Sequence, residues 1–266
     1  MDINITRIKD GLTGYQLKVI AILFMLIDHI NIYLGEFLGW PAWVGFLGRF
    51  VAPLFAFLLV EGYFHTHSKR KYLERLLLGA LIVGIGNIIY NLLTHDYLNP
   101  VTHQPDYFLF LGPHNIFLTL AMELVLIWPL DNILKHHRTV LSIFTLVVSA
   151  GLMLSFEGGL YLLPLAIIFF LGQRYHQANL VLIGIVLWCG FLFIRAWLSF
   201  KSGMTGETSF YSYLTFNNEF MMVMVVPFIW LYNGQRGGNG SRAEKNFFYY
   251  FYPIHLWIIY LIKAFV

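Results

Sequence analysis

Charged residues are scarce in this sequence. Only 12% of its 266 residues are Asp, Glu, Lys or Arg, whereas 58% are hydrophobic. A soluble domain is about one quarter charged, so this composition excludes an ordinary soluble enzyme and predicts an all-α, polytopic transmembrane helical bundle. The formal net charge is only +3. Because the basic residues fall in short loops between apolar runs, we expect no nucleic-acid partner.

Cysteine is almost absent as well. Cys189 is the one thiol, which excludes an intramolecular disulfide. The sequence also lacks a glycine-rich phosphate loop, a G-x-S-x-G elbow and a Cys-x-x-Cys pair. Its histidines do not have the spacing of a zinc protease, so we predict no metal site. With neither an internal repeat nor a soluble domain, residues 1–266 are expected to form a single integral membrane domain.

Long apolar runs are what the sequence does contain. Runs of this length and composition are typical of membrane-spanning helices. We predict about nine spans, at 15–35, 43–65, 73–93, 107–130, 139–155, 159–173, 179–198, 212–232 and 247–265. The first run is too long and too charged for a cleaved signal peptide, so we expect it to stay in the mature protein.

Basic residues gather on alternate loops. A Lys/Arg excess marks the cytoplasmic side of a membrane protein, which here places the N-terminus inside and the C-terminus outside. The glycine-rich segment 233–246 is expected to be a flexible cytoplasmic loop. The loops assigned to the cytoplasm contain Lys69, Arg70, Lys71, Arg75, Lys135, Arg138, Arg174, Arg236, Arg242 and Lys245.

Three ionisable residues interrupt the first span. Charged groups inside a bilayer cost several kcal/mol and generally mark functional positions, which makes Lys18, Asp28 and His29 candidates. Lys18 and His29 are eleven residues apart, so they share one helix face at a separation of about 17 Å. Asp28 points about 100° away from His29, and Arg49 on the second span is its expected partner.

Polar residues of four predicted spans fall at similar depth. Counting 1.5 Å per residue places them about 20 Å above the cytoplasmic edge, within the range that helix tilt can change. This outer layer contains Asp28, His29, Arg49, Asn87, His114 and Asn115. A second layer near the cytoplasmic edge contains Lys18, Glu61 and Glu123, and His65 follows Glu61 on the same helix face.

Each of these residues also has a purely structural interpretation. Lys18 can extend its ammonium group to the interface, and an Asp28–Arg49 pair can fix helix register. Asn87 and Asn115 can hydrogen-bond neighbouring helices. The shared depth of the set, and the cost of burying the His29 imidazole, favour the functional interpretation.

Four stretches resemble the TraX family. They are LKVIAILFMLIDHI (17–30), GRFVAPLFAFLLVEGYFHT (48–66), HNIFLTL (114–120) and FYYFYPIHL (248–256). The family is named after a conjugative-plasmid membrane protein that acetylates the N-terminus of pilin. The resemblance covers almost the whole chain and is densest in the first two spans and the last. It implies a bacterial cytoplasmic-membrane acetyltransferase.

Lys18 followed by His29 also resembles the basic-x10-His motif of the larger acyltransferase-3 group. There the histidine is the proposed catalytic residue and the basic residue lies on the acyl-donor side. The stretch 253–256 is similar to a Tyr-x-x-His-type motif of those proteins, which implies a donor-side role for His255. This sequence departs from the group in its nine predicted spans, against about ten, and in Asp28 before the histidine.

Together these observations predict an integral-membrane acyltransferase. It would move an acetyl or other short acyl group from cytoplasmic acyl-CoA to an amine or hydroxyl at the outer side. The acceptor remains open between a peptide N-terminus, a glycan, a lipid and a small molecule. His29 is the expected general base, a role suited to an unperturbed imidazole pKa of about 6.5. Asp28 would position Arg49, and Arg49, His114 or Asn115 would stabilise the oxyanion.

The residues expected to contact the acyl donor come from several predicted spans and from the basic loop at 69–71. They are Lys18, Glu61, Lys69, Arg70, Lys71, Asn87 and His255. Two other functions stay open: a small-solute or proton-coupled transporter that uses the Asp28/His29/Arg49 layer, and a non-catalytic assembly protein. The absence of a visible repeat favours the transferase over the transporter.

Overall fold

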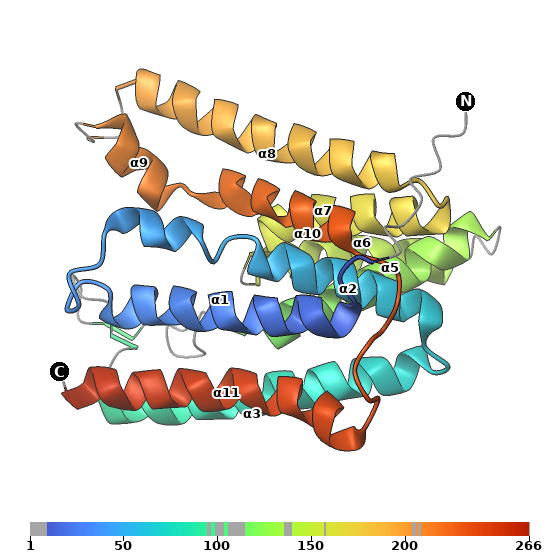
Figure 1. Cartoon of the computed structure of the whole chain (residues 1–266), viewed down its shortest axis with the longest axis horizontal. Helices are drawn as coiled ribbons and strands as arrows, with labels where there is room; N and C mark the ends of the chain where they lie inside the picture. Colours follow the sequence, from blue (N-terminus) through green and yellow to red (C-terminus); the bar gives the residue numbers. More distant parts are fainter. Residues whose placement is uncertain are drawn as a thin grey trace. The chain divides into compact units, whose positions relative to one another are not determined.

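The computed structural model describes residues 10–94, 97–98, 104–105, 115–135, 140–156, 158–203, 206 and 209–265. The regular structure of these residues is helical, and they form no strand, only two isolated β-bridges (Figure 1). The elements are α1 Gly14–Leu34, the 3₁₀ helix η1 Ala42–Phe46, α2 Val51–His65, α3 Lys69–Thr94, α5 Ile116–Leu134, α6 Val140–Leu154, α7 Gly159–Arg174, α8 Ala178–Lys201, α9 Phe210–Phe216, the 3₁₀ helix η2 Glu219–Met224, α10 Val225–Leu231 and α11 Arg242–Phe265.

The helical class of the fold is confirmed, and every predicted span contains helix among its described residues. Within the described ranges, five helices are long and apolar enough to cross a membrane: α1, 42–65, α3, α5 and α8. A sixth is obtained if α9 and the η2–α10 segment, which are bent by 66° relative to each other, are counted as one span. Helices α6 and α7 are shorter, with 15 and 16 residues. The count of nine spans and the orientation of the termini remain predictions.

Helix α1 begins at a capping box. The Thr13 side chain accepts a hydrogen bond from the Gln16 backbone N–H, and the Gln16 side chain accepts one from the Thr13 backbone N–H at 2.9 Å. This exchange satisfies two N–H groups that a helix start leaves without intrahelical acceptors. The helix then runs for 21 residues, long enough to carry Lys18 and His29 on one face.

The second predicted span is not one continuous helix. The sequence predicts a helix over 43–65, whereas the structure has η1, a turn over 47–50 and then α2. Pro53 explains the interruption, because its ring excludes a regular hydrogen bond to residue 49 and clashes with that carbonyl. The chain instead forms i→i+3 bonds, from Arg49 N to Phe46 O and from Val51 N to Gly48 O. This turn is the local structure that positions Arg49.

The chain consists of two compact units. Unit 1 contains residues Met1–Leu58 and Pro164–Glu244, and unit 2 contains Leu59–Leu163 and Lys245–Val266. The boundaries fall inside α2, α7 and α11, so each of these helices contributes residues to both units.

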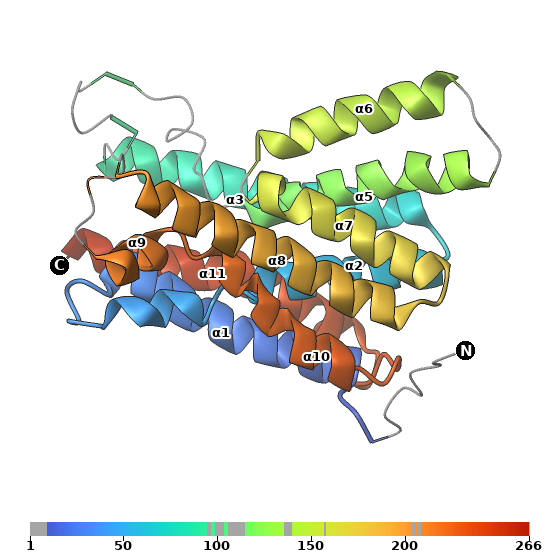
Figure 2. The ribbon, with the colours of Figure 1, turned by 90° about the horizontal axis from the view of Figure 1, so that it is seen from above.

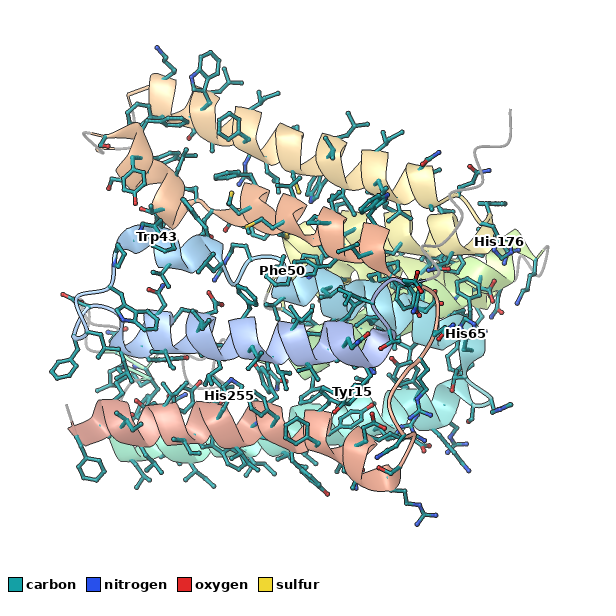
Figure 3. All side chains as sticks on the ribbon, viewed as in Figure 1. Tyr15, Trp43, Phe50, His65, His176 and His255 are labelled. Carbon is teal, nitrogen blue, oxygen red and sulfur yellow. The ribbon has the colours of Figure 1, made fainter. Side chains whose placement is uncertain are left out.

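Aromatic rings form much of the core of unit 1. The Phe50 ring is fully buried, stacks on Phe228 at 4.5 Å between centroids and meets the edge of Phe24 at 5.1 Å (Figure 3). A second group forms around Phe57, whose ring contacts Phe169 and Tyr232 edge to face. Burying large rings supplies most of the apolar area of such a core.

Two helix pairs build unit 2. Helices α3 and α11 run together (Figure 1), with Tyr90 stacked on Tyr260 at 4.4 Å and Gly86 against the Trp257 ring. A Cβ on Gly86 would lie 2.3 Å from Trp257 Nε1, so only glycine fits there. Helices α5 and α6 lie side by side (Figure 2).

A buried carboxylate joins three elements of unit 2. Asp131 on α5 is 1% exposed and accepts hydrogen bonds from Tyr63 Oη at 2.9 Å, Lys69 Nζ at 3.4 Å and Lys135 Nζ at 2.8 Å. Lys69 Nζ also donates to Tyr63 Oη. A buried carboxylate is tolerated when donors and opposite charges surround it. Asp131 therefore joins the end of α2 and the start of α3 to α5.

Replacing Asp131 should destabilise the protein measurably. In Asp131→Ala the Tyr63 hydroxyl and both lysines lose their shared acceptor, which should cost about 1–3 kcal/mol because both lysines are partly solvated. We expect the midpoint of thermal unfolding in detergent to fall by several degrees, and by less in Asp131→Asn. Glu74→Ala is the matched control, since its ion pair with Arg70 at 2.9 Å is exposed and should contribute little. Equal midpoints for both alanine variants would contradict this role of Asp131.

Candidate functional site

The predicted Asp28–Arg49 pair is observed in unit 1. Arg49 Nη2 donates to Asp28 Oδ1 at 3.1 Å and to Oδ2 at 3.2 Å. The side chains are 29% and 13% exposed, so water only partly screens their attraction. Arg49 Nε is buried and has no hydrogen-bond acceptor among the described residues. A buried donor of this kind requires an explanation, and one explanation is a ligand oxygen.

Gly48 allows α1 to approach the η1 segment closely at this pair, and Gly45 lies at the same contact. A Cβ on Gly48 would lie 2.1 Å from Asp28 Cγ, which no side chain tolerates. A Cβ on Gly45 would lie 3.4 Å from Asn31 Nδ2 and 3.5 Å from Asn218 Nδ2, an ordinary contact. Gly45 and Gly48 are three residues apart, which is one turn of a 3₁₀ helix. Asp28 and Asn31 are also three residues apart, which is slightly less than one turn of the α-helix α1. Asp28 and Asn31 therefore both face the η1 segment.

His29 lies on a different face of α1 from this contact. The residue is 6% exposed, and its position is rotated by about 100° from Asp28 and 160° from Asn31. Met25 and Lys18 share its face, with Met25 also buried. The His29 imidazole thus follows the ion-paired Asp28 in the sequence and lies on the same face of α1 as Lys18.

Lys18 is half-buried one turn into α1. The charges of Arg236 and Glu244 act on its ammonium group. Both residues come from segment 233–246, which is predicted from the sequence to be flexible. In the structure this segment accepts hydrogen bonds from the start of α1, from Gly14 N to Gln235 O and from Tyr15 N to Arg236 O, both at 2.8 Å.

The polar residues predicted on the third and fourth spans belong to unit 2. Asn115 caps α5 by accepting from Leu118 N at 3.3 Å, and its Nδ2 donates to Ala80 O on α3 at 2.9 Å. These bonds give it a structural role between two helices. Asn87 on α3 is 2% exposed. His114 lies outside the described residues. The predicted layer shared with His29 stays a prediction.

The three cationic residues expected to bind the donor at 69–71 have different surroundings from one another. Lys69 is held by Asp131, and Arg70 forms an exposed pair with Glu74. Lys71 is exposed. The attraction of Lys69 and Arg70 for another anion is therefore partly offset by carboxylates of their own unit.

The remaining predicted donor contacts also have partners in unit 2. Glu61 is buried, and the His65 ring lies 3.9 Å from its carboxylate and 2.8 Å from its carbonyl oxygen, as their spacing predicts. His255 is 6% exposed, and its Nδ1 lies 2.7 Å from Phe251 O. That nitrogen must carry the proton in a neutral ring, which leaves Nε2 as an acceptor. The His255 ring, on the helix labelled α11 in Figure 1, also stacks on the Phe251 ring.

Several polar residues were missed as site candidates. Asp131 could have been found, because Lys135 follows it by four residues, the spacing of a helical ion pair. Asn218 lies at the break between α9 and η2 and is 9% exposed, but a break within an apolar run leaves little signal. Glu123 was assigned to the layer near the cytoplasmic edge from its predicted depth in the membrane alone. It is fully buried, with no hydrogen-bond donor to either carboxylate oxygen among the described residues.

Gly48→Ala should disrupt the ion pair. The added methyl overlaps Asp28, so the carboxylate must move away from Arg49, and such overpacking costs about 1–3 kcal/mol. We expect a lower unfolding midpoint in detergent. Gly190→Ala is the control, because a Cβ there meets nothing within 4 Å and alanine favours a helix. A Gly48→Ala midpoint equal to that of Gly190→Ala would show that the contact is not tight.

Comparisons with known proteins identify the family of this chain. A family model described as TraX protein matches residues 13–263. The chain is also 28% identical, over 261 residues, to the probable fimbrial assembly protein FimC of serogroup H1 from Dichelobacter nodosus. That alignment covers 96% of this chain and 97% of the relative. No solved structure matches. Because the family model spans both the Lys18–His29 helix and the α11 segment, this protein belongs to the TraX family.

Proposed function

We propose that this protein is an integral-membrane acyltransferase of the bacterial cytoplasmic membrane. It transfers an acetyl or other short acyl group from cytoplasmic acyl-CoA to an amine or hydroxyl at the outer side. The observation that carries the proposal is the arrangement on α1. A buried imidazole, His29, follows an aspartate paired with an arginine whose Nε has no acceptor in the described structure.

The residues have complementary chemistry for acyl transfer. The acceptor nitrogen or oxygen attacks the thioester carbonyl carbon, a new C–N or C–O bond forms, and the C–S bond breaks. His29 accepts the acceptor's proton and returns it to the departing sulfur, which leaves as the thiol of CoA. Arg49 donates from Nε to the carbonyl oxygen as negative charge develops there. Asp28 is a positioning residue, because it fixes the guanidinium through Nη2.

The stripe from Lys18 to His29 supports a donor that enters from one end of α1. Eleven residues correspond to about 17 Å along the helix axis, a length that an extended pantetheine arm can cover. The phosphates then remain near the lysine, and the thioester reaches the imidazole. The donor does not have to cross the membrane.

A protein or peptide amine is the acceptor that the comparison favours. The similar protein of D. nodosus is described as a probable fimbrial assembly protein, and fimbriae are assembled from exported protein subunits. An exported subunit presents its N-terminal amine at the outer side, where the proposed reaction ends.

Removing the imidazole tests the transferase. His29→Ala should reduce acyl-CoA-dependent transfer by about 100-fold or more, the typical contribution of general-base catalysis. The assay measures a radiolabelled acetyl group on a pilin-like peptide, with purified protein in nanodiscs. His65→Ala is the control, because its side chain is 69% exposed and has no proposed role. Both variants should have the same elution profile as the wild type. Unchanged turnover in His29→Ala would refute the assignment.

The broken helix at 210–231 supports a second candidate, a small-solute transporter. Its parts are bent by 66°, with Asn217 and Asn218 at the break. Interrupted spans in transporters expose backbone groups that bind a substrate near the bilayer midplane. Asn218 also approaches Gly45, beside the Asp28–Arg49 pair.

Transport and transfer give opposite results in sealed vesicles. A transporter should move a proton or solute without acyl-CoA, and Arg49→Gln should abolish that flux. A transferase should show no flux above that of protein-free vesicles, while acyl groups appear on the acceptor only when acyl-CoA is present. Proteoliposomes that contain a pH-sensitive dye, followed with and without acyl-CoA, distinguish the two.

A further inference from the structure

The glycine-rich segment 233–241 is folded onto the start of α1. Asn233 N donates to Leu12 O and its Nδ2 donates to Gly11 O, both at 3.0 Å. Gln235 O and Arg236 O accept from Gly14 N and Tyr15 N. Carbonyl groups of the segment therefore occupy N–H groups in the first turn of the helix, and the Arg236 backbone is held there.

Its glycines are required by conformation and by space. Gly234, Gly237, Gly238 and Gly240 all have φ between 66° and 78°, a region that other residues rarely adopt. A Cβ on Gly237 would lie 2.3 Å from Thr13 Oγ1, and one on Gly238 would lie against the Glu244 carboxylate. Glu244 Oε2 also accepts from Gly240 N at 2.7 Å. The segment therefore has a defined backbone conformation, which a flexible linker does not have.

This shape brings two positive charges together. Arg236 is exposed, and its Nη1 lies 3.2 Å from the position of a Cβ on Gly240. Its charge acts on the half-buried Lys18, and Glu244 is the carboxylate whose charge opposes it there. Two neighbouring cations attract an anion more strongly than either cation alone, so this end of α1 favours a negatively charged ligand.

Arg236 has a geometric advantage over the cations at 69–71. It lies in the same unit as Lys18 and His29, whereas Lys69 and Arg70 are paired with Asp131 and Glu74. From solvent inward, the order is an exposed guanidinium, a half-buried ammonium group and, about 17 Å further along α1, a buried imidazole.

We propose that Arg236, held beside Lys18 by segment 233–241, binds a phosphate group of the acyl-CoA donor. This inference rests on the proposed function and adds a donor-specificity residue to it. A guanidinium fits a phosphate through two parallel hydrogen bonds, and the lysine adds a point charge. The segment thus selects donors that carry phosphates over shorter thioesters that lack them.

Arg236→Gln tests the phosphate contact. Loss of a charge-assisted hydrogen bond should raise KM for acetyl-CoA roughly tenfold, while kcat stays near the wild-type value. KM for acetyl-pantetheine, which has the same thioester and no phosphate, should not change. Arg242→Gln is the control, because it removes the same charge from a neighbouring exposed position. Arg236→Lys should restore part of the affinity.

Binding measurements separate failure of this site from failure of the transferase. CoA without an acyl group, titrated into the wild type and Arg236→Gln by calorimetry, should bind the wild type roughly tenfold more tightly. Equal affinities, or equal rises in KM for both thioesters, would overturn the phosphate contact and leave the transferase intact. A wild type that binds no CoA and transfers no acyl group would overturn both. If Arg236→Gln does not fold, Arg236→Lys with both thioesters gives the same discrimination.

Discussion

The Asp28–Arg49 ion pair is the interaction on which the candidate site depends. An aspartate inside an apolar helix is costly unless an opposite charge and hydrogen bonds accompany it. The turn before Pro53 supplies the guanidinium, and Gly48 supplies the space in which the carboxylate lies. One proline and one glycine thus help to place this ion pair, and His29 follows Asp28 along the same helix.

The ion-paired groups around Asp131 and around Arg49 differ in how completely their polar atoms are satisfied. In unit 2 the buried Asp131 carboxylate is bound by two lysines and a tyrosine. These residues satisfy one another, which indicates a structural role. In unit 1 Arg49, which pairs with Asp28, keeps a buried Nε donor that has no acceptor among the described residues. Positions where local balance is incomplete are those at which a ligand contributes most.

The sequence predicted helices in the right places because long apolar runs have few other solutions in a membrane. It also predicted the pairing of Asp28 with Arg49, since a buried carboxylate requires a cation and few were near. It did not predict the interruption of 43–65 into η1 and α2. The extent of the i→i+3 stretch depends on the contact between Gly48 and Asp28 of α1, which composition does not record.

The segment at 233–246 shows why part of the site could not be predicted. Its glycines suggest flexibility when the sequence is considered alone, because the same residues serve linkers and specific turns. The specific turn is distinguished from a linker by its contacts: carbonyl groups of the segment accept hydrogen bonds from the N–H groups of residues 14 and 15. Those residues lie more than 200 positions away in the chain. No local pattern contains that information.

This long-range contact has a consequence for biosynthesis. Helix α1 is made first, but Asn233, whose side chain binds Gly11 O, follows 222 residues later. At roughly 5–20 residues per second, a ribosome needs about 10–45 s to supply it. During that interval the leading helix already contains its lysine and imidazole, but the segment that covers its amino end does not yet exist. A nascent or truncated chain therefore contains all of α1 well before it contains the segment that binds the amino end of this helix.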